Sequence, residues 1–67
     1  MATFIEVWDL DDEEFVVINV DHVVKLRARY DIDDKQELTV AHWEDTSTTR
    51  IGHTVAAVID LIAKAKK

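Results

Sequence analysis

The side chains best suited to catalysis or metal binding in this chain are three histidines, His22, His42 and His53. None of them stands in an H-x-x-x-H or H-x-E spacing, which would bring two ligands, or a ligand and a base, close together. The chain has no cysteine, so thiolate zinc sites and disulfide bonds are excluded. We therefore expect no bound metal and no cofactor, and three unrelated histidines.

The other residue types that catalysis requires are also poorly placed. Ser47 is the only serine and has no histidine beside it, and Gly52 is the only glycine, so a glycine-rich phosphate loop is excluded. The carboxylates cluster in polar stretches, where no burial would raise their pKa toward neutrality. A chain of 67 residues also rarely encloses a pocket of roughly 300 Å³ or more. These observations predict a protein that is not an enzyme.

The charge of the chain limits its partners. Fourteen acidic and eight basic residues give a formal charge of −6, which argues against direct binding to nucleic acid, because such binding needs Lys and Arg to neutralise phosphates. No apolar run approaches the ~20 residues of a membrane span. The acidic first segment lacks the basic start and apolar centre of a signal peptide. We expect a cytoplasmic protein without membrane insertion.

Hydrophobic patterning predicts one small α+β domain over residues 1–67. Runs rich in β-branched and aromatic residues predict strands at about 3–8, 15–20, 23–30, 37–43 and 49–51. Apolar residues at helical spacing predict a helix at about 54–66, which must pack on the sheet because it is marginal alone. The expected fold is an antiparallel meander of four to five strands with one C-terminal amphipathic helix on one face.

Local features indicate where these elements begin and end. The stretch 14–30 is too long for one strand, and the Asn and Asp in Asn19–His22 favour a turn through side-chain bonds to the main chain, so we predict a corner there. Thr54 can cap the helix, and Asp60 and Lys64 form a favourable pair one turn apart. The apolar stripe of the helix is formed by Val55, Val58, Ile59, Leu61 and Ile62.

The order of these elements, with FVVINVDHVVKL (Phe15–Leu26) at its centre, resembles the small bacterial flagellar proteins of the FlbD/SwrD type and small phage and bacterial proteins of the same layout. That family tends to show an Asn-containing corner followed by an apolar pair. Its hairpins often contain glycine, whereas this chain has DLDDEE and DIDDKQ. The resemblance covers nearly the whole chain and implies the layout and a flagellar role, with no catalytic residue.

The predicted third and fourth strands bring a basic row to one face of the sheet. Lys25, Arg27 and Arg29 occupy alternate positions, and a hairpin would set them beside Trp43. Tryptophan next to arginine is typical of interaction hot spots, so we expect these four residues to bind a protein partner. The alternative is a solvated face with cross-strand pairs such as Arg29 with Glu37.

A second copy of the chain is a further expected partner. Val16 and Ile18 point to the opposite side of their strand from Phe15 and Val17, and one helix covers only one face of a sheet. The apolar side chains on the uncovered face therefore favour a homo-oligomer, most simply a two-fold dimer.

The sequence therefore predicts a non-enzymatic protein-interaction module that self-associates. Two other functions fit the same sequence. In the first, the chain is a phage-type inhibitor whose acidic surface mimics nucleic acid and occupies a nucleic-acid-handling enzyme. The residues that would carry this function are Asp11, Asp12, Glu13, Glu14, Asp31, Asp33 and Asp34. In the second, the chain binds a small ligand at a subunit interface, with His42 in the pocket.

Overall fold

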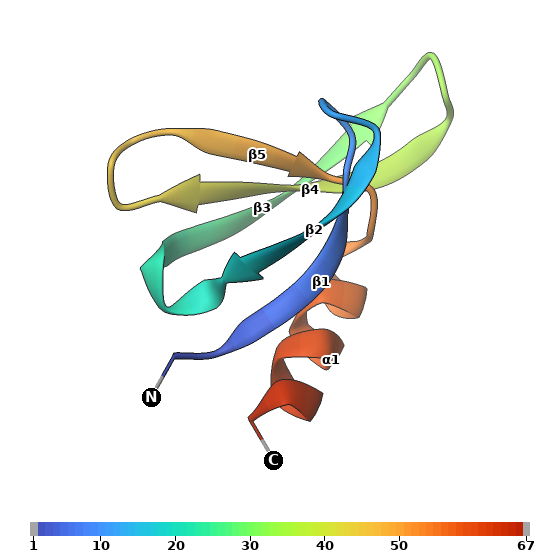
Figure 1. The fold of residues 1–67 in the computed structure, drawn as a ribbon. Helices are drawn as coiled ribbons and strands as arrows, with labels where there is room; N and C mark the ends of the chain where they lie inside the picture. The colour runs from blue at the N-terminus through green and yellow to red at the C-terminus, as the bar shows by residue number, and fades with distance from the viewer. Residues whose placement is uncertain (1, 67) are drawn as a thin grey trace.

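The computed structural model of the protein describes residues 2–66 and consists of one antiparallel five-stranded sheet and one helix (Figure 1). The elements in chain order are β1 (Phe4–Asp9), β2 (Glu14–Asn19), the 3-10 turn η1 (Val20–His22), β3 (Val23–Asp31), β4 (Gln36–Trp43), β5 (Thr48–Ile51) and α1 (Val55–Ala65). The predicted α+β fold class is confirmed. Each strand and the helix begins and ends within one residue of its predicted position.

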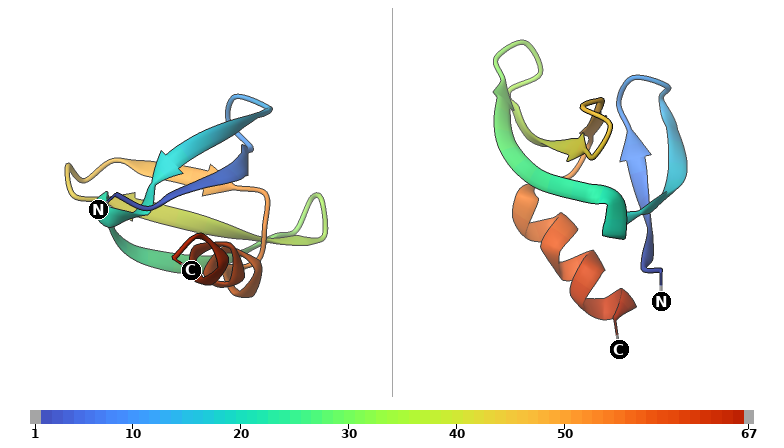
Figure 2. Two further views of the ribbon diagram at one scale, coloured as in Figure 1. Left: turned by 60° about the horizontal axis from the view of Figure 1, so that its bottom comes forward. Right: turned by 90° about the vertical axis from the view of Figure 1, so that its left-hand side faces the viewer.

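The order of the strands across the sheet is β2-β1-β5-β4-β3, which differs from a simple meander. β1 pairs with β5 at Asp9 and Ile51, and the main-chain bond from Gly52 N–H to the Trp8 carbonyl continues this junction at 2.8 Å. β2 and β3 therefore lie at the two edges of the sheet, although they follow one another in the chain. The sheet is curled, so that the β1–β2 and β3–β4 hairpins form opposite walls of the molecule (Figure 2).

The predicted corner between β2 and β3 is confirmed, and Asn19 forms it. Its side-chain Oδ1 accepts a hydrogen bond from the N–H of Asp21 at 3.0 Å, and the N–H of Val23 then donates to the Val20 carbonyl. An Asn side chain gives the main chain a partner outside the strand ladder. The apolar stretch 14–30 is consequently two strands joined by one turn of 3-10 helix.

The β1–β2 and β3–β4 hairpins use the same turn. Asp9 and Asp31 end their first strands, and Oδ1 of each accepts from the N–H groups two and three residues further on, at 2.8 and 3.3 Å in the first loop and 2.9 and 3.3 Å in the second. In both loops the fourth residue after the Asp has a positive φ, 54° at Glu13 and 53° at Lys35. Glycine usually takes that conformation. Here the Asp side chains stabilise each turn without it.

The core lies between the concave face of the sheet and α1. Its buried residues are Ile5, Val7, Ala41, Ile51 and Val58. Thr39 is also fully buried, and its Oγ1 donates to the carbonyl of His53 at 2.8 Å. That bond joins the middle of β4 to the segment that enters the helix, so the position of α1 over the sheet is fixed by a polar contact as well as by apolar packing.

The start of α1 is the one that the sequence predicts. Oγ1 of Thr54 accepts from the N–H of Ala57 at 3.1 Å, which satisfies one main-chain donor of the first turn. Nζ of Lys64 lies 2.9 Å from Oδ2 of Asp60, so the predicted ion pair is confirmed. Within residues 2–66, no helix has both the length and the apolar character needed to cross a membrane.

The apolar stripe of α1 is narrower than predicted. Val58 is fully buried, and Leu61 and Ile62 pack against the core. Ile59 is 55% exposed, because it lies at the margin of the surface that the helix presents to the sheet. One large apolar side chain of the helix, Ile59, is therefore left mostly in solvent.

Candidate protein-binding surfaces

The register of β3 and β4 decides which residues share a face of the sheet. The cross-strand partners are Lys25 with His42, Arg27 with Val40, Arg29 with Leu38 and Tyr30 with Glu37. The three basic residues therefore lie on the convex face of the sheet together with His42, Val40 and Leu38. The predicted pair of Arg29 with Glu37 is wrong, because a change of one residue in register transfers a whole strand to the other face.

Trp43 lies on the opposite face from the basic residues, so the prediction that it joins them is wrong. It is the strand partner of Val23, and its indole Nε1 donates to Oγ1 of Thr49 at 2.9 Å. The physical reason is the register, which pairs the basic residues with Leu38, Val40 and His42. Trp43 is therefore left on the side of Thr39 and Ala41, which are fully buried.

The start of β3 also departs from strict alternation. A β-bulge between Val23 and Lys25 adds one unpaired residue, Val24, to the strand. Val23 consequently packs on the core with Leu26, whereas Val24 is 61% exposed. Strict alternation from Val23 to Tyr30 predicts Val24 and Leu26 on one face, and the bulge makes that prediction wrong.

We call Lys25, Arg27 and Arg29 the basic ladder. Each has a partner on β4, and Val40 lies between two arginines, Arg27 on β3 and Arg50 on β5. Val40 is 8% exposed although it lies on the convex face of the sheet. The aliphatic stems of the flanking arginines can cover such a residue while their charged ends stay in water. On this part of the convex face, the apolar side chain of Val40 is therefore buried and the charged ends of the arginines face the solvent.

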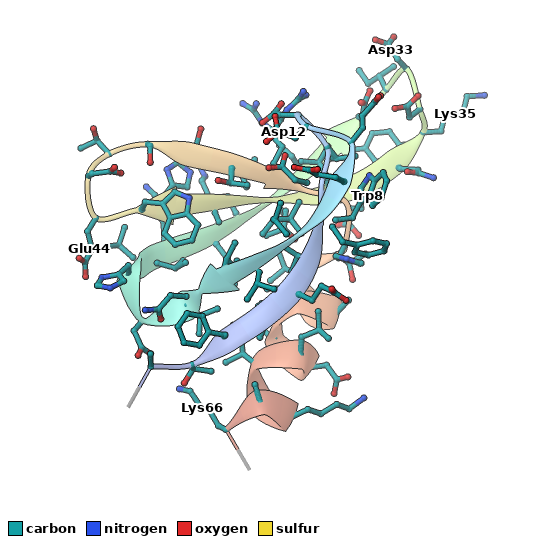
Figure 3. The ribbon with its side chains drawn as sticks, viewed as in Figure 1. Trp8, Asp12, Asp33, Lys35, Glu44 and Lys66 are labelled. Atoms are coloured by element: carbon teal, nitrogen blue, oxygen red, sulfur yellow. The ribbon has the colours of Figure 1, made fainter. Side chains whose placement is uncertain are left out.

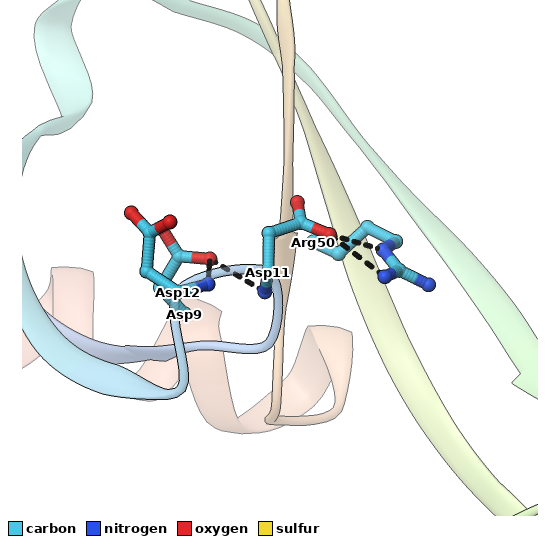
Figure 4. A network of polar contacts seen from close by, with 4 residues as sticks. All are labelled: Asp9, Asp11, Asp12 and Arg50. Atoms are coloured by element: carbon cyan, nitrogen blue, oxygen red, sulfur yellow. Dashed lines mark hydrogen bonds and ion pairs between the residues drawn. The ribbon is translucent and has the colours of Figure 1, made fainter.

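The fourth cation of this face, Arg50, is already paired. Its Nε and Nη2 both donate to Oδ1 of Asp11, at 2.9 and 2.7 Å (Figure 4). The bond to Asp11 raises the pKa of Arg50. Asp11 belongs to the β1–β2 loop, so this contact links the tip of one hairpin to the middle of the sheet.

The basic ladder has no such partner in the part of the chain that the structure describes, where the ion pairs join His22 to Glu44, Arg50 to Asp11 and Lys64 to Asp60. A shallow depression of about 280 Å³ lies on the ladder and is lined by Arg27, Ala28, Arg29, Val40, His42 and Thr48. Desolvation lowers the pKa of His42, and the positive charges of Lys25, Arg27 and Arg29 lower it further. Among the described residues, the positive charges of the ladder therefore form no ion pair with a carboxylate.

A second exposed surface lies on the convex face of the other hairpin. We call Phe4, Trp8, Phe15 and Val17 the aromatic face. The rings of Trp8 and Phe15 pack edge to face with their centroids 5.0 Å apart. Phe4, Phe15 and Val17 are 56%, 61% and 65% exposed. The carboxylate of Glu6 belongs to the same face, since Glu6 is the strand partner of Val17. Large exposed apolar patches of this kind are typical of interaction sites.

The sequence only partly reveals the aromatic face. The alternation in β2 separates Phe15 and Val17 from Val16 and Ile18 without indicating which pair lies away from the core, and no pattern indicates on which face Trp8 lies. The register decides this, because Trp8 is the strand partner of Phe15. The tryptophan of the exposed surface is therefore Trp8, and Trp43 belongs to the concave side.

The acidic residues considered for nucleic-acid mimicry lie at the tips of the two hairpins. Both tips project from the same end of the molecule, where Asp12 and Asp33 lie, and Lys66 marks the other end (Figure 3). Part of this charge is engaged within the molecule. Asp11 is paired with Arg50, and Asp31 accepts main-chain N–H groups of its own loop.

The three histidines lie in separate environments. Nδ1 of His22 lies 3.2 Å from Oε2 of Glu44, His42 lies beside the basic ladder, and Nε2 of His53 accepts the N–H of Trp8 at 3.2 Å. Within residues 2–66, no three His, Asp or Glu side chains come together in a way that could hold a metal ion.

Comparison of the chain with protein-family models, with curated proteins and with solved structures finds no match. Its function therefore has to be argued from the chemistry of its two exposed surfaces.

Proposed function

We propose that the protein is a non-enzymatic interaction module that self-associates and binds an acidic, extended segment of a protein partner on the basic ladder. The observation that carries this proposal is the concentration of unpaired positive charge along one strand of an acidic chain. Three of the eight basic residues lie within Lys25–Arg29, whereas the net charge is −6. Positive charge gathered in this way selects anionic partners.

The spacing of the ladder favours an extended partner over a helical one. Lys25, Arg27 and Arg29 project from alternate positions of β3, so neighbouring charges are about 6.7 Å apart along the strand. An extended peptide with a carboxylate at every second position has the same repeat. Arginine can bind a carboxylate through two parallel hydrogen bonds, which adds orientation to attraction.

The place of β3 in the sheet supports the same mode of binding. β3 is one of the two edge strands and is nine residues long. An edge strand presents main-chain N–H and C=O groups with which an extended peptide can pair. A partner segment beside β3 would gain main-chain hydrogen bonds from the edge and ion pairs from the ladder.

The proposal is tested by fluorescence anisotropy with a labelled peptide of alternating Glu and Val. The wild-type protein should bind it, with an affinity that falls as salt is added, because exposed charges are screened. Arg27→Gln and Arg29→Gln should each weaken binding by about two- to fivefold. Lys64→Gln removes the same charge from α1, far from the ladder, and should bind as the wild type does. Equal losses in all three variants would contradict a specific site.

A further inference from the structure

The charge of this protein is divided between its two hairpins. Residues 1–24 hold seven acids and neither Lys nor Arg, and the basic ladder follows immediately in residues 25–29. The β1–β2 hairpin is thus wholly anionic and carries the aromatic face, whereas the convex side of β3–β4 is cationic. The two hairpins form opposite walls of the molecule (Figure 2).

The aromatic face and the basic ladder are chemically complementary. Guanidinium and ammonium groups bind carboxylates, and Glu6 supplies one in the middle of the aromatic face. They also stack on aromatic rings, and Phe4 and Phe15 are more than half exposed. The aliphatic stems of the ladder could cover Val17, which is 65% exposed.

We propose that the occupant of the basic ladder is the aromatic face of a second copy of this chain. This inference rests on the self-association part of the proposed function and names the two surfaces that make the contact; the acidic segment of another protein would compete for the same ladder. The contact joins two different surfaces, so it is heterologous, and an open assembly keeps one unoccupied ladder at one end and one unoccupied aromatic face at the other. Because the two surfaces lie on opposite walls, one molecule can contact a neighbour on each side. The resulting assembly is a ring or an open chain.

A two-fold dimer through the aromatic face alone is less favourable. Such a dimer would place a hairpin without any basic residue against its own copy, including the two Glu6 carboxylates. Facing like charges disfavour association. The head-to-tail contact replaces this repulsion with attraction and covers the same apolar side chains.

Two variants that each lose one surface test the inference. The ladder variant carries Arg27→Glu and Arg29→Glu, and the aromatic-face variant carries Glu6→Gln and Val17→Thr, so the two altered surfaces cannot attract each other. All four residues are exposed, so the variants should keep the fold, which circular dichroism and thermal melting verify. Lys64→Glu on α1 is the matched control for charge reversal. Sedimentation velocity then measures the mass of each protein alone and of an equimolar mixture.

The wild type and the Lys64→Glu control should form species that grow with concentration beyond a dimer. Each surface variant alone should remain a monomer, and the mixture should form a dimer and nothing larger, since only one intact contact is available. Self-association of the ladder variant alone, or a mixture that stays monomeric, would overturn the inference. A monomeric wild type would overturn it too. The acidic-peptide titration decides the proposed binding function separately, because peptide binding requires only the ladder.

Discussion

The main-chain N–H of Trp8 donates a hydrogen bond to Nε2 of His53, although 45 residues separate them. The bond lies where the pairing of β1 with β5 ends, next to the Gly52 N–H that donates to the Trp8 carbonyl. An imidazole ring therefore completes the strand ladder at the edge of the aromatic face. It also sets the tautomer, because Nε2 can accept only when the ring is neutral with its proton on Nδ1.

Replacement of His53 by Ala should destabilise the protein by about 1 kcal/mol, because the half-buried N–H of Trp8 loses its acceptor. Urea unfolding followed by tryptophan fluorescence measures the loss. His22→Ala is the control, since His22 is exposed and contacts only an exposed carboxylate. If both variants unfold at the wild-type midpoint, the bond to Trp8 contributes nothing to stability.

Removal of one carboxylate should strengthen binding to the ladder. Asp11→Asn releases Arg50 from its ion pair and adds a fourth unpaired cation to the convex face. Affinity for the acidic peptide should rise by about two- to fivefold, the range of a single exposed ion pair, with little change in stability. Anisotropy titration at low salt measures the gain.

Asp12→Asn provides the matched control for this prediction. It changes the net charge equally and lies in the same loop, but the carboxylate that contacts Arg50 belongs to Asp11. Equal gains in both variants would show that overall charge, and not the release of Arg50, controls binding.

The pKa of His42 depends on the positive charges of the basic ladder. Its pKa is lowered by desolvation and by the three basic residues, so the folded protein favours the neutral ring. The contribution of His42 to stability is therefore present above its unfolded pKa of about 6.5 and is lost as the pH falls through the lower pKa of the folded protein. Titration of the His42 ring protons by NMR should show a higher pKa in Arg27→Gln, whereas Lys64→Gln should leave it unchanged. If the pKa of His42 is the same in Arg27→Gln as in the wild type, the charge of Arg27 does not act on the His42 ring.

The β4–β5 loop contains a strained residue, Thr46, whose φ is 71°. A β-branched residue rarely adopts a positive φ, whereas glycine does so without a steric penalty. Thr46→Gly should therefore stabilise the protein by about 0.5–1 kcal/mol, measured by urea unfolding. Thr48→Gly, two residues further on in β5, should have the opposite effect, because glycine weakens a strand. A loss of stability in both variants would contradict strain at Thr46.

The bounds of the strands and the helix could be predicted because they depend on local chemistry. The Asn19 corner, the Thr54 cap and the Asp60–Lys64 pair are each made by residues within four positions of one another. The paired hairpin loops at Asp9 and Asp31 follow the same logic. Side-chain hydrogen bonds of this range can be inferred from spacing alone.

The faces of the strands could not be predicted as well, because they depend on register and on the order of strands. Arg29 pairs with Leu38 instead of Glu37. The bulge at Val24 turns Val23, and not Val24, toward the core with Leu26. The contact between β1 and β5 brings together residues more than 40 positions apart. These features place Trp43 on the concave side and leave Trp8 on the exposed face.

Mapping of the bound peptide by NMR tests the central claim most directly. Amide shifts of the ¹⁵N-labelled protein should change on addition of the Glu–Val peptide along β3 from Lys25 to Arg29 and at His42. They should remain unchanged on α1. Changes confined to other elements, or no change at any peptide concentration, would contradict the claim that the basic ladder is the binding surface of this protein.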